Sequence, residues 1–429
     1  MKQYNAAILG FGTVGSGVYR ILTENRHDLM HREALDVEVK QILIRDFAHE
    51  SNLHLAPREI FTTDYNTILD DAEIGIVVEC MGGVEPARTF ILAALERGKT
   101  VVTSNKEVIS KHWFEFEAAA KASGAGLYIE ATVAGGIPII RTITDSMQAN
   151  NITRVMGIIN GTTNYILTKM SEEGREFSDV LKEAQDLGYA EANPSADVDG
   201  FDAMYKLSIL SSLAFHAHMP IEVVYREGIR NLTAADFSAA KMLGCKIKLL
   251  AIGKKNGNKI EVRVHPTMLP EQHPLATVRG VFNAVFLTGH AVDDVMLYGR
   301  GAGCMPTASA VVSDVIYACH AAPHHRYSTF RNAQTMSNEI ELVRDFECIY
   351  CIRLRVLDQP GTMASIANVF AEHGVSLKSV LQLGSAEGGL SRITFMTHTA
   401  RELSVQAALE EIAALPCVDA VENMIRAEE

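Results

Sequence analysis

The sequence lacks the features that mark membrane, secreted and nucleic-acid-binding proteins. No apolar run in its 429 residues approaches the roughly 20 residues that a membrane-spanning helix needs. Acidic residues outnumber basic ones by 52 to 39, which argues against nucleic acid as the main partner. The N-terminal stretch MKQYNAAILGFG enters a strand pattern at once and leaves no room for a signal peptide. We therefore expect a cytoplasmic protein with no membrane or nucleic-acid partner.

Cysteines are few, and they do not form a metal-binding pattern. The seven cysteines lie far apart, mostly inside apolar segments. Cys348 and Cys351 form a C-x-x-C pair, but no second pair or histidine cluster completes a zinc site. The spacing fits a strand that enters a core, and a redox motif is the alternative. Reduced thiols agree with a cytoplasmic location.

The chain is too long for one ordinary core, so two or three domains are expected. Residues 1–130 alternate short apolar runs such as AAILGFG and IGIVVEC with helical patterns such as PARTFILAALERG. This alternation predicts an α/β domain with a parallel, Rossmann-type sheet. Residues 131–330 place helical stretches before clustered strands, which predicts an α+β domain. We expect the helical stretch around 303–321 to pack back and close the first domain.

The C-terminal part has a pattern of its own. Residues 331–348 are polar and weakly periodic, and we expect them to form a linker. From 349 to 429 the pattern reads strand, helix, strand, strand, helix, strand. This order predicts a small βαββαβ domain of the ferredoxin-like type, large enough to have its own core.

The stretch GFGTVG, residues 10–15, follows a strand and opens a helix, the context in which G-x-G-x-x-G indicates dinucleotide binding. Gly10 allows the tight turn, Gly12 lets pyrophosphate approach the backbone, and Gly15 lets helix and strand come close. Amides at the helix start then attract the phosphates. We interpret Gly17 as ordinary helix packing.

The residues at the end of the second predicted strand indicate which cofactor binds. An acidic residue at this place binds the ribose of NAD, whereas an arginine accommodates the 2′-phosphate of NADP. The sequence reads Ile44-Arg45-Asp46. Arg45 favours NADP and Asp46 keeps NAD open, while a solvated loop cation is the alternative for Arg45.

Motifs spread from Ala7 to Asp314 together resemble homoserine dehydrogenase. They read AILGFGTVGSGV, VTSNKEVIS, EATVAGGIPII, INGTTNYIL, AQDLGYAEANPSADVDGFDAMYKL and GRGAGCMPTASAVVSD. The tail, with VLDQPGTMASIANVFAEHGVSLKSVLQ, resembles an ACT domain, an amino-acid-sensing module. The resemblance implies NAD(P)H-dependent interconversion of L-aspartate 4-semialdehyde and L-homoserine, on the path to threonine and methionine.

Asp202 and Lys206 are four residues apart in a helical pattern, so they lie one turn apart on one face. Without other information, a weak surface ion pair would be the expected interpretation. The resemblance implies that Lys206 is the acid/base group for the aldehyde and that Asp202 is its partner and a substrate contact. It also assigns a catalytic and cofactor-binding role to Lys106, which follows the fourth predicted strand; an ordinary helix-start lysine is the alternative.

The resemblance implies further substrate contacts in two motifs. Gly188 and Glu191 belong to DLGYAEANP, where the carboxylate of Glu191 would pair the substrate ammonium group. A solvated loop carboxylate is the alternative for Glu191. Thr163 belongs to NGTTN, which without the resemblance is typical of a strand-to-helix cap.

The remaining cofactor and metal residues come from the resemblance as well. The further cofactor contacts that it implies are Phe11, Thr13, Val14, Thr103, Ser104 and Gly303. The stretch EATVAGGIPI combines one carboxylate with carbonyls of a glycine-rich turn, which suit a hard cation. The resemblance implies a sodium ion bound by Glu130 and the carbonyl oxygens of Val133, Gly135 and Ile137. A domain hinge without an ion is the alternative.

Two other functions stay open at this point. A thiol-dependent semialdehyde dehydrogenase would use Cys304 as nucleophile, but such catalysis needs a positioned histidine base. A non-catalytic amino-acid sensor would not need the charged residues described above. The ACT resemblance favours L-threonine as an effector, and we expect a homodimer or a homotetramer.

Overall fold

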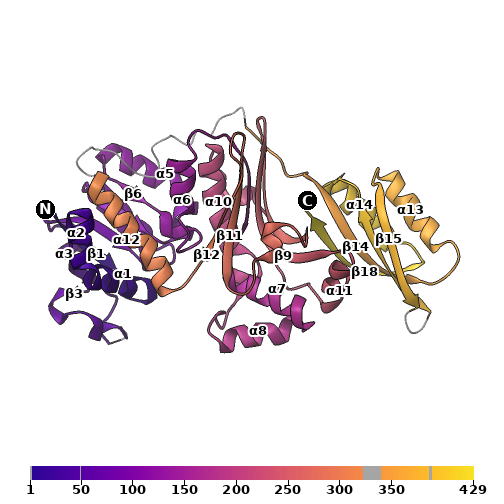
Figure 1. Ribbon diagram of the computed structural model, residues 1–429, viewed down its shortest axis with the longest axis horizontal. Coiled ribbons are helices and arrows are strands. Elements are labelled where there is room, and N and C mark those ends of the chain that lie inside the picture. The colour runs from indigo at the N-terminus through magenta and orange to yellow at the C-terminus, as the bar shows by residue number, and fades with distance from the viewer. Residues whose placement is uncertain (1, 49, 322–339, 386–388) are drawn as a thin grey trace. The chain divides into compact units, whose positions relative to one another are not determined.

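The computed structural model describes residues 2–48, 50–321, 340–385 and 389–429, and it divides into two compact units (Figure 1). The first unit comprises Met1–Asn160, Ala203–Val224 and Phe282–Ile340, and the second comprises Gly161–Asp202, Tyr225–Val281 and Glu341–Glu429. Among the described residues, none of the helices has the length and apolar character that crossing a bilayer requires. Residues 331–339 of the expected linker lie outside the described residues.

The first unit is built on a six-stranded parallel sheet of the predicted Rossmann type. Its strands, in spatial order, are β3 (Phe61–Thr62), β2 (Leu35–Leu43), β1 (Lys2–Leu9), β4 (Ile74–Glu79), β5 (Thr100–Thr103) and β6 (Leu127–Tyr128). All neighbouring strands are parallel. This is the 3-2-1-4-5-6 order of dinucleotide-binding folds, in which ligands bind at the carboxyl ends of the strands.

Helices cover this sheet, and one of them comes from far along the chain. The helices of this part are α1 (Thr13–Glu24), α2 (Arg26–Glu33), α3 (Tyr65–Leu69), α4 (Ala87–Glu96), α5 (Lys106–Ser123) and α12 (Cys304–Ala321). Val311 and Val315 of α12 join Ile8 and Val18 in one buried core. Figure 1 shows α12 in orange among the indigo and violet elements. Burial of its apolar side chains in the shared core holds it against the sheet.

The first unit also holds antiparallel strands, as the α+β pattern predicts. β7 (Ile152–Ile158), β11 (Phe282–Gly289) and β12 (Asp293–Arg300) pair antiparallel in the order β12-β11-β7. Its other helices are the short α6 (Ile139–Arg141) and most of α10 (Phe201–Phe215), whose buried residues make it a core helix.

The second unit combines helices of the central part with the whole C-terminal part. Its helices are α7 (Gly161–Glu173), α8 (Phe177–Asp186), α9 (Ser195–Val198), α11 (Ala234–Met242), α13 (Thr362–Glu372) and α14 (Glu402–Ala413). Its main strands, in spatial order, are β9 (Cys245–Asn256), β10 (Lys259–Pro270), β18 (Val418–Ala427), β14 (Glu347–Leu357), β16 (Leu390–Thr397) and β15 (Leu377–Ser385). β14-α13-β15-β16-α14-β18 is the predicted βαββαβ order, closed around its own core.

Three short strands complete this unit: β8 (Tyr225–Arg226), β13 (Glu341–Leu342) and β17 (Ala400–Arg401). β13 pairs with β10, although it lies in the stretch that the sequence suggested as a linker. The C-terminal strand β18 also pairs with β10, in parallel, through Thr267 opposite Arg426 and Met268 opposite Ala427. Two separate segments from the C-terminal part of the chain are therefore hydrogen-bonded to the same central strand.

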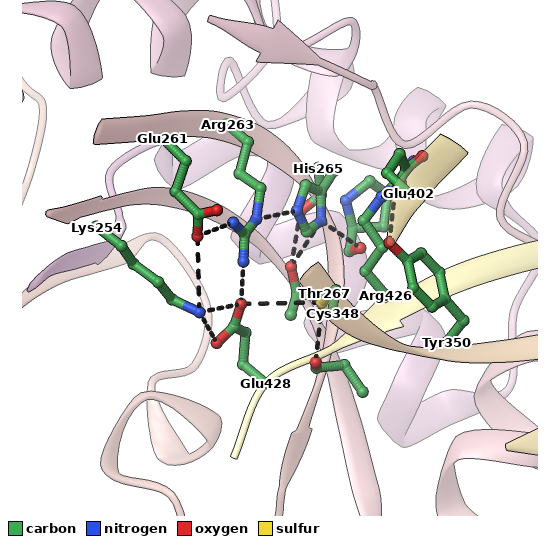
Figure 2. Close-up of polar contacts among 12 residues, drawn as sticks. Lys254, Glu261, Arg263, His265, Thr267, Cys348, Tyr350, Glu402, Arg426 and Glu428 are labelled. Atoms are coloured by element: carbon green, nitrogen blue, oxygen red, sulfur yellow. Dashed lines mark hydrogen bonds and ion pairs between the residues drawn. The ribbon is translucent and has the colours of Figure 1, made fainter. Parts of the chain in front are cut away.

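Two fully buried arginines lie where β10 and β18 meet, and Figure 2 shows their partners. Arg263 on β10 pairs with Glu261 and with Glu428. Arg426 on β18 pairs with Glu402 of α14. Each buried guanidinium thus faces carboxylates, as the cost of desolvating a charge requires.

Cys348 and Cys351 both lie in β14 and are buried, and Cys348 belongs to the core of the C-terminal domain. Burial raises the pKa of the Cys348 thiol to about 11 and that of Cys351 to about 12. Thiols that stay protonated are poor nucleophiles. The C-x-x-C spacing therefore belongs to a strand that enters a core.

Candidate active site

The glycine motif forms a tight turn between β1 and α1. Gly10 has a φ of 90°, which favours glycine, and its amide donates to the carbonyl of Leu43 at 2.9 Å. A Cβ at Gly15 would lie 2.0 Å from the Gly10 carbonyl oxygen, so only glycine lets the helix approach the turn. A Cβ at Gly12 would meet no atom within 4 Å. This open, glycine-lined start of a helix fits a pyrophosphate group.

The side chains around this turn divide into buried and accessible ones. The ring of Phe11 is buried and packs edge-on against Phe61 at 5.2 Å, so Phe11 offers a cofactor only its backbone. Thr13 is exposed at the start of α1, and Val14 is half-buried. A Cβ at Gly17 would lie 2.8 Å from the Cys304 sulfur, which confirms the packing role of this glycine.

Arg45 lies beyond the end of β2, and its side chain is exposed. The neighbouring Asp46 accepts the amide of Ala48 at 2.7 Å, so its carboxylate closes a local turn. An accessible guanidinium beside an engaged carboxylate is the arrangement that suits a ribose phosphate better than a bare ribose.

Glu79, at the end of β4, is a residue that the sequence analysis missed. Its carboxylate has no exposed surface and accepts the hydroxyl of Thr103 at 2.5 Å. Thr103 is itself fully buried, so its side chain holds Glu79 and cannot reach a bound cofactor. Ser104 and Lys106 are half-buried, and Lys106 begins α5. The only sequence signal for Glu79 was one acid that ends the apolar run IGIVV.

Lys206 is a buried ammonium group on α10. It is 8% exposed, and its Nζ donates to the carbonyl of Ile159 at 2.9 Å. Asp202, in the first turn of the same helix, is 7% exposed. This burial excludes the interpretation of an ordinary surface pair. Burying a charged group costs free energy unless other groups pair with it or form hydrogen bonds to it.

The predicted substrate residues of the second unit lie on α7 and on the loop after α8. Gly188 has a φ of 74° and directly follows the end of α8. The hydroxyl of Thr162 donates to the carbonyl of Tyr189 at 2.7 Å and so ties the start of α7 to this loop. Thr163 is buried beside that contact, and Glu191 is exposed.

Lys248 on β9 is another buried ammonium group, and no sequence motif indicated it. Its Nζ donates to the carbonyl of Val278 and to Oδ1 of Asn164, the latter at 3.1 Å. Burial lowers its pKa to about 8. Asn164 belongs to the same NGTTN motif as Thr163, so this cation supports α7 from within the core.

Glu130 lies beyond β6 and is 3% exposed. Its two carboxylate oxygens accept the amides of Ile140 and Arg141, each at 2.8 Å. Its own amide donates to Oδ2 of Asp314 on α12 at 2.8 Å, and Arg141 pairs with Asp314. Burial and the nearby charge of Asp314 raise the pKa of Glu130 to about 7.

The turn after Glu130 carries the predicted carbonyl ligands. Ala134 and Gly135 have φ values of 56° and 50°, so the backbone turns sharply there. A Cβ at Gly135 would lie 2.5 Å from the carbonyl oxygen of Gly301, which leaves room for glycine alone. The carbonyl of Ile137 already accepts the amide of Ile139 at 2.8 Å. One buried carboxylate beside turn carbonyls is a donor set that fits a monovalent cation.

Cys304 begins α12, directly after Gly303, which has a φ of 117° and is exposed. The Cys304 thiol donates to the carbonyl of Thr13 at 2.8 Å, next to the glycine turn. The thiol is thus engaged with the start of α1, and Gly303 lies one residue away from that contact.

Three family models match consecutive parts of the chain. One described as the NAD binding domain of homoserine dehydrogenase matches residues 10–130, and one described as homoserine dehydrogenase matches residues 138–316. A model of the ACT domain matches residues 352–417. These ranges fall within the parallel-sheet domain, the central α+β part and the C-terminal domain in that order.

Similar proteins match over the full length of the chain. The homoserine dehydrogenase of Bacillus subtilis (strain 168) is 40% identical over 432 residues, covering 100% of this chain and 99% of the relative. That of Synechocystis sp. is 44% identical over 434 residues, with 98% of each covered.

Solved structures agree with these matches. A homoserine dehydrogenase from Thiobacillus denitrificans superposes with a TM-score of 0.94 at 41% identity, covering 100% of this chain and 99% of the other. A hyperthermophilic archaeal homoserine dehydrogenase in complex with NADPH superposes with a TM-score of 0.65 at 31% identity, covering 76% of this chain and 100% of that one.

Proposed function

Because the chain belongs to the homoserine dehydrogenase family, an NAD(P)-dependent oxidoreductase family, we propose that Lys206 is the general acid and base of its reaction. That reaction interconverts L-aspartate 4-semialdehyde and L-homoserine in amino-acid biosynthesis. The observation that carries the proposal is the burial of the Lys206 ammonium group, 2.9 Å from the carbonyl oxygen of Ile159. Neither a thiol-dependent dehydrogenase nor a non-catalytic sensor is favoured by the family match.

The chemistry divides between the cofactor and the side chains. When bound, the nicotinamide cofactor supplies or receives the hydride. Lys206 donates a proton to the aldehyde oxygen as it becomes an alkoxide, and it takes the proton back in the reverse direction. The hydrogen bond to Ile159 fixes Nζ in place, which reduces the entropic cost of reaching the reactive geometry. Asp202 balances the charge of Lys206 and contacts the substrate, and Lys106 adds a second cation for the developing negative charge.

Substrate recognition is assigned to the loop after α8 and to the start of α7. Glu191 pairs the substrate ammonium group, Gly188 offers its backbone, and Thr163 contributes from the NGTTN motif. The bond from Thr162 to the carbonyl of Tyr189 supports this grouping, because it joins the two segments.

We assign NADP as the preferred cofactor, with NAD as the alternative. The exposed guanidinium of Arg45 supports this choice, since it matches a ribose 2′-phosphate. The backbone of Gly10–Gly15, with Phe11, Thr13 and Val14, holds the pyrophosphate. Thr103 through its backbone, Ser104, Lys106 and Gly303 serve the nicotinamide half.

We further assign a sodium ion to Glu130 and the carbonyls of Val133, Gly135 and Ile137. The raised pKa of Glu130 supports a cation, which would stabilise the ionised carboxylate. The ion would hold the turn between the parallel-sheet domain and α6, and it takes no part in proton or hydride transfer.

The ACT domain is assigned to the binding of L-threonine as a feedback effector, in a cytoplasmic homodimer or homotetramer. We assign residues 1–130 to the NAD(P)-binding domain, 131–330 to the catalytic and dimerisation domain, 331–348 to a linker and 349–429 to the ACT domain. Millimolar threonine should inhibit homoserine oxidation by the full-length enzyme, because threonine binding shifts the equilibrium between conformations of the enzyme. An enzyme that ignores threonine and the other aspartate-family amino acids would show that the domain serves assembly.

The test of the central proposal is Lys206→Ala, with Lys99→Ala as a matched control. Lys99 is also a buried lysine of the first unit, and its Nζ donates to the carbonyls of Asp71 and Ile74 at 2.7 Å. Loss of a general acid lowers kcat by about 10²–10⁴-fold, while NADPH still binds. The control should lose stability and keep its kcat. A Lys206→Ala enzyme within twofold of the wild-type kcat would remove Lys206 from the mechanism.

A further inference from the structure

Glu79 is a carboxylate without exposed surface at the edge of the sheet where the cofactor binds. One of its oxygens accepts the amide of Met81 at 2.7 Å, and the other accepts the hydroxyl of Thr103 at 2.5 Å. Burial raises its pKa, and these donors oppose that rise. These two donors are neutral, and they come from two segments, the loop after β4 and the end of β5.

The bonds continue from Thr103 to the start of α5. The hydroxyl oxygen of Thr103 accepts the amide of Asn105 at 3.0 Å. Asn105 caps α5 by accepting the amide of Val108 at 3.2 Å, and its Nδ2 donates to the carbonyl of Gly83 at 2.6 Å. Residues 80–83 and the first turn of α5, which begins at Lys106, are thus held as one piece with Glu79 beneath it.

Residues 80–83 also lie close to the glycine turn between β1 and α1, which is proposed to hold the pyrophosphate. A Cβ at Gly10 would lie 3.0 Å from Cγ of Met81 and 3.1 Å from the carbonyl oxygen of Cys80. In a sheet of this strand order, β1 to β3 carry the adenosine half of the dinucleotide, and β4 to β6 carry the nicotinamide half. Glu79 therefore lies under the half of the cofactor where hydride transfer takes place.

We propose that Glu79 is a positioning residue for hydride transfer and that it acts through Lys106. By accepting from Met81 and Thr103 at once, its carboxylate fixes the loop after β4 against the start of α5. The ammonium group of Lys106 then projects from a fixed helix end. This inference rests on the proposed role of Lys106, because Glu79 itself does not contact the reacting groups.

A carboxylate suits this place because it only accepts hydrogen bonds. In Glu79→Gln the new NH₂ group would face either the Met81 amide or the Thr103 hydroxyl. The hydroxyl already accepts the amide of Asn105, so it would have to accept a second donor and turn its own hydrogen away. We expect the loop and the helix start to shift apart, although the shape of residue 79 is kept.

The experiment is a double-mutant cycle of Glu79→Gln and Lys106→Ala in the full-length enzyme. Glu79→Gln should lower kcat by about 10- to 100-fold, the size that small misplacements of reacting groups produce. Its KM for homoserine should stay unchanged, because the substrate contacts are elsewhere. In the Lys106→Ala background, Glu79→Gln should cause little further loss, since residues that act as a unit are not additive.

Two further variants separate positioning from folding. Thr103→Val removes the hydroxyl that donates to Glu79 and accepts from Asn105, and it should reproduce the loss of kcat even if Glu79→Gln does not fold. Glu117→Gln is the matched control: Glu117 is a buried glutamate on α5, paired with Lys121 at 2.5 Å far from Lys106. It should change the melting temperature and leave kcat alone.

The outcomes distinguish the two proposals. A Lys106→Ala enzyme with full kcat would overturn the role of Lys106 and, with it, the inference for Glu79. If Lys106→Ala is impaired but Glu79→Gln and Thr103→Val keep kcat, only the inference fails. Independent, multiplicative losses of kcat in the cycle would also overturn it.

Discussion

Sodium should stabilise the first unit in a way that grows with pH, and Glu130 sets the size of the effect. Its pKa is about 7 in the folded chain against 4.5 in the unfolded one. The folded state therefore keeps a proton that the unfolded state has lost between these two values, and stability falls as pH rises through this window. A difference of about 2.5 units corresponds to about 3.4 kcal/mol, fully felt above pH 7.

Asp314 acts in the same direction, because burial raises its pKa from 3.8 to about 6. The two carboxylates repel each other, so their penalties are not independent and do not add. A bound cation favours the ionised form and opposes the loss of stability. If sodium recovers about 2 kcal/mol at pH 8, the melting temperature should rise by roughly 4–8 °C. Near pH 5 the gain should be close to zero, since Glu130 is protonated there.

The assay follows the fluorescence of Trp113, the only tryptophan of the chain, which is buried on α5 in the first unit. Melting curves are recorded between about pH 5 and pH 8 in sodium chloride and in tetramethylammonium chloride at equal ionic strength. Glu130→Gln should remove the sodium effect, and the control Glu117→Gln should keep it. Parallel curves in the two salts across the whole pH range would refute the assignment of a cation to Glu130.

Three other predictions follow from single side chains. Arg45→Ala should raise KM for NADP more than for NAD, as measured by kcat/KM with each cofactor, and equal losses would show that Arg45 does not read the 2′-phosphate. Lys248→Met should be most stable relative to the wild type below pH 8, because the buried ammonium group is penalised there; a difference in urea unfolding that stays constant up to pH 10 would contradict this. Glu428→Gln should destabilise the chain by about 3 kcal/mol in urea, since it removes one of the two carboxylates that face the buried Arg263. Glu429→Gln, at an exposed neighbour, is its control and should change little.

Much of the fold could be predicted because the local periodicity of apolar residues indicates its helices and strands. The alternation of apolar runs and helical patterns before residue 130 predicts a parallel sheet, and the C-terminal pattern predicts βαββαβ. The pairing of β18 with β10 was not predictable in this way. It joins strands about 150 residues apart in sequence, and nothing in either strand alone specifies the partner.

In the candidate site, too, local sequence predicts some features and not others. Gly10, Gly12 and Gly15 were predictable because a tight turn next to a phosphate leaves few other choices. Glu79 and Lys248 were not, because their importance comes from burial. A charged residue at the end of an apolar run is usually exposed, and only the packing of the whole unit determines that these two are enclosed.

The joint between β10 and β18 has a consequence for how the protein is made. The amide of Glu428 donates to the carbonyl of Met268 at 3.0 Å, and 160 residues separate the two. At ribosomal rates of about 5–20 residues per second, β10 waits roughly 8–32 s before β18 has been synthesised. During that time β8 can already pair with β10 at Arg263 and Val264, but Thr267 and Met268 lack the strand that pairs with them, and Arg263 lacks the carboxylate of Glu428. An unpaired strand edge can pair with another chain, so this end of β10 is a site for aggregation until β18 has been synthesised.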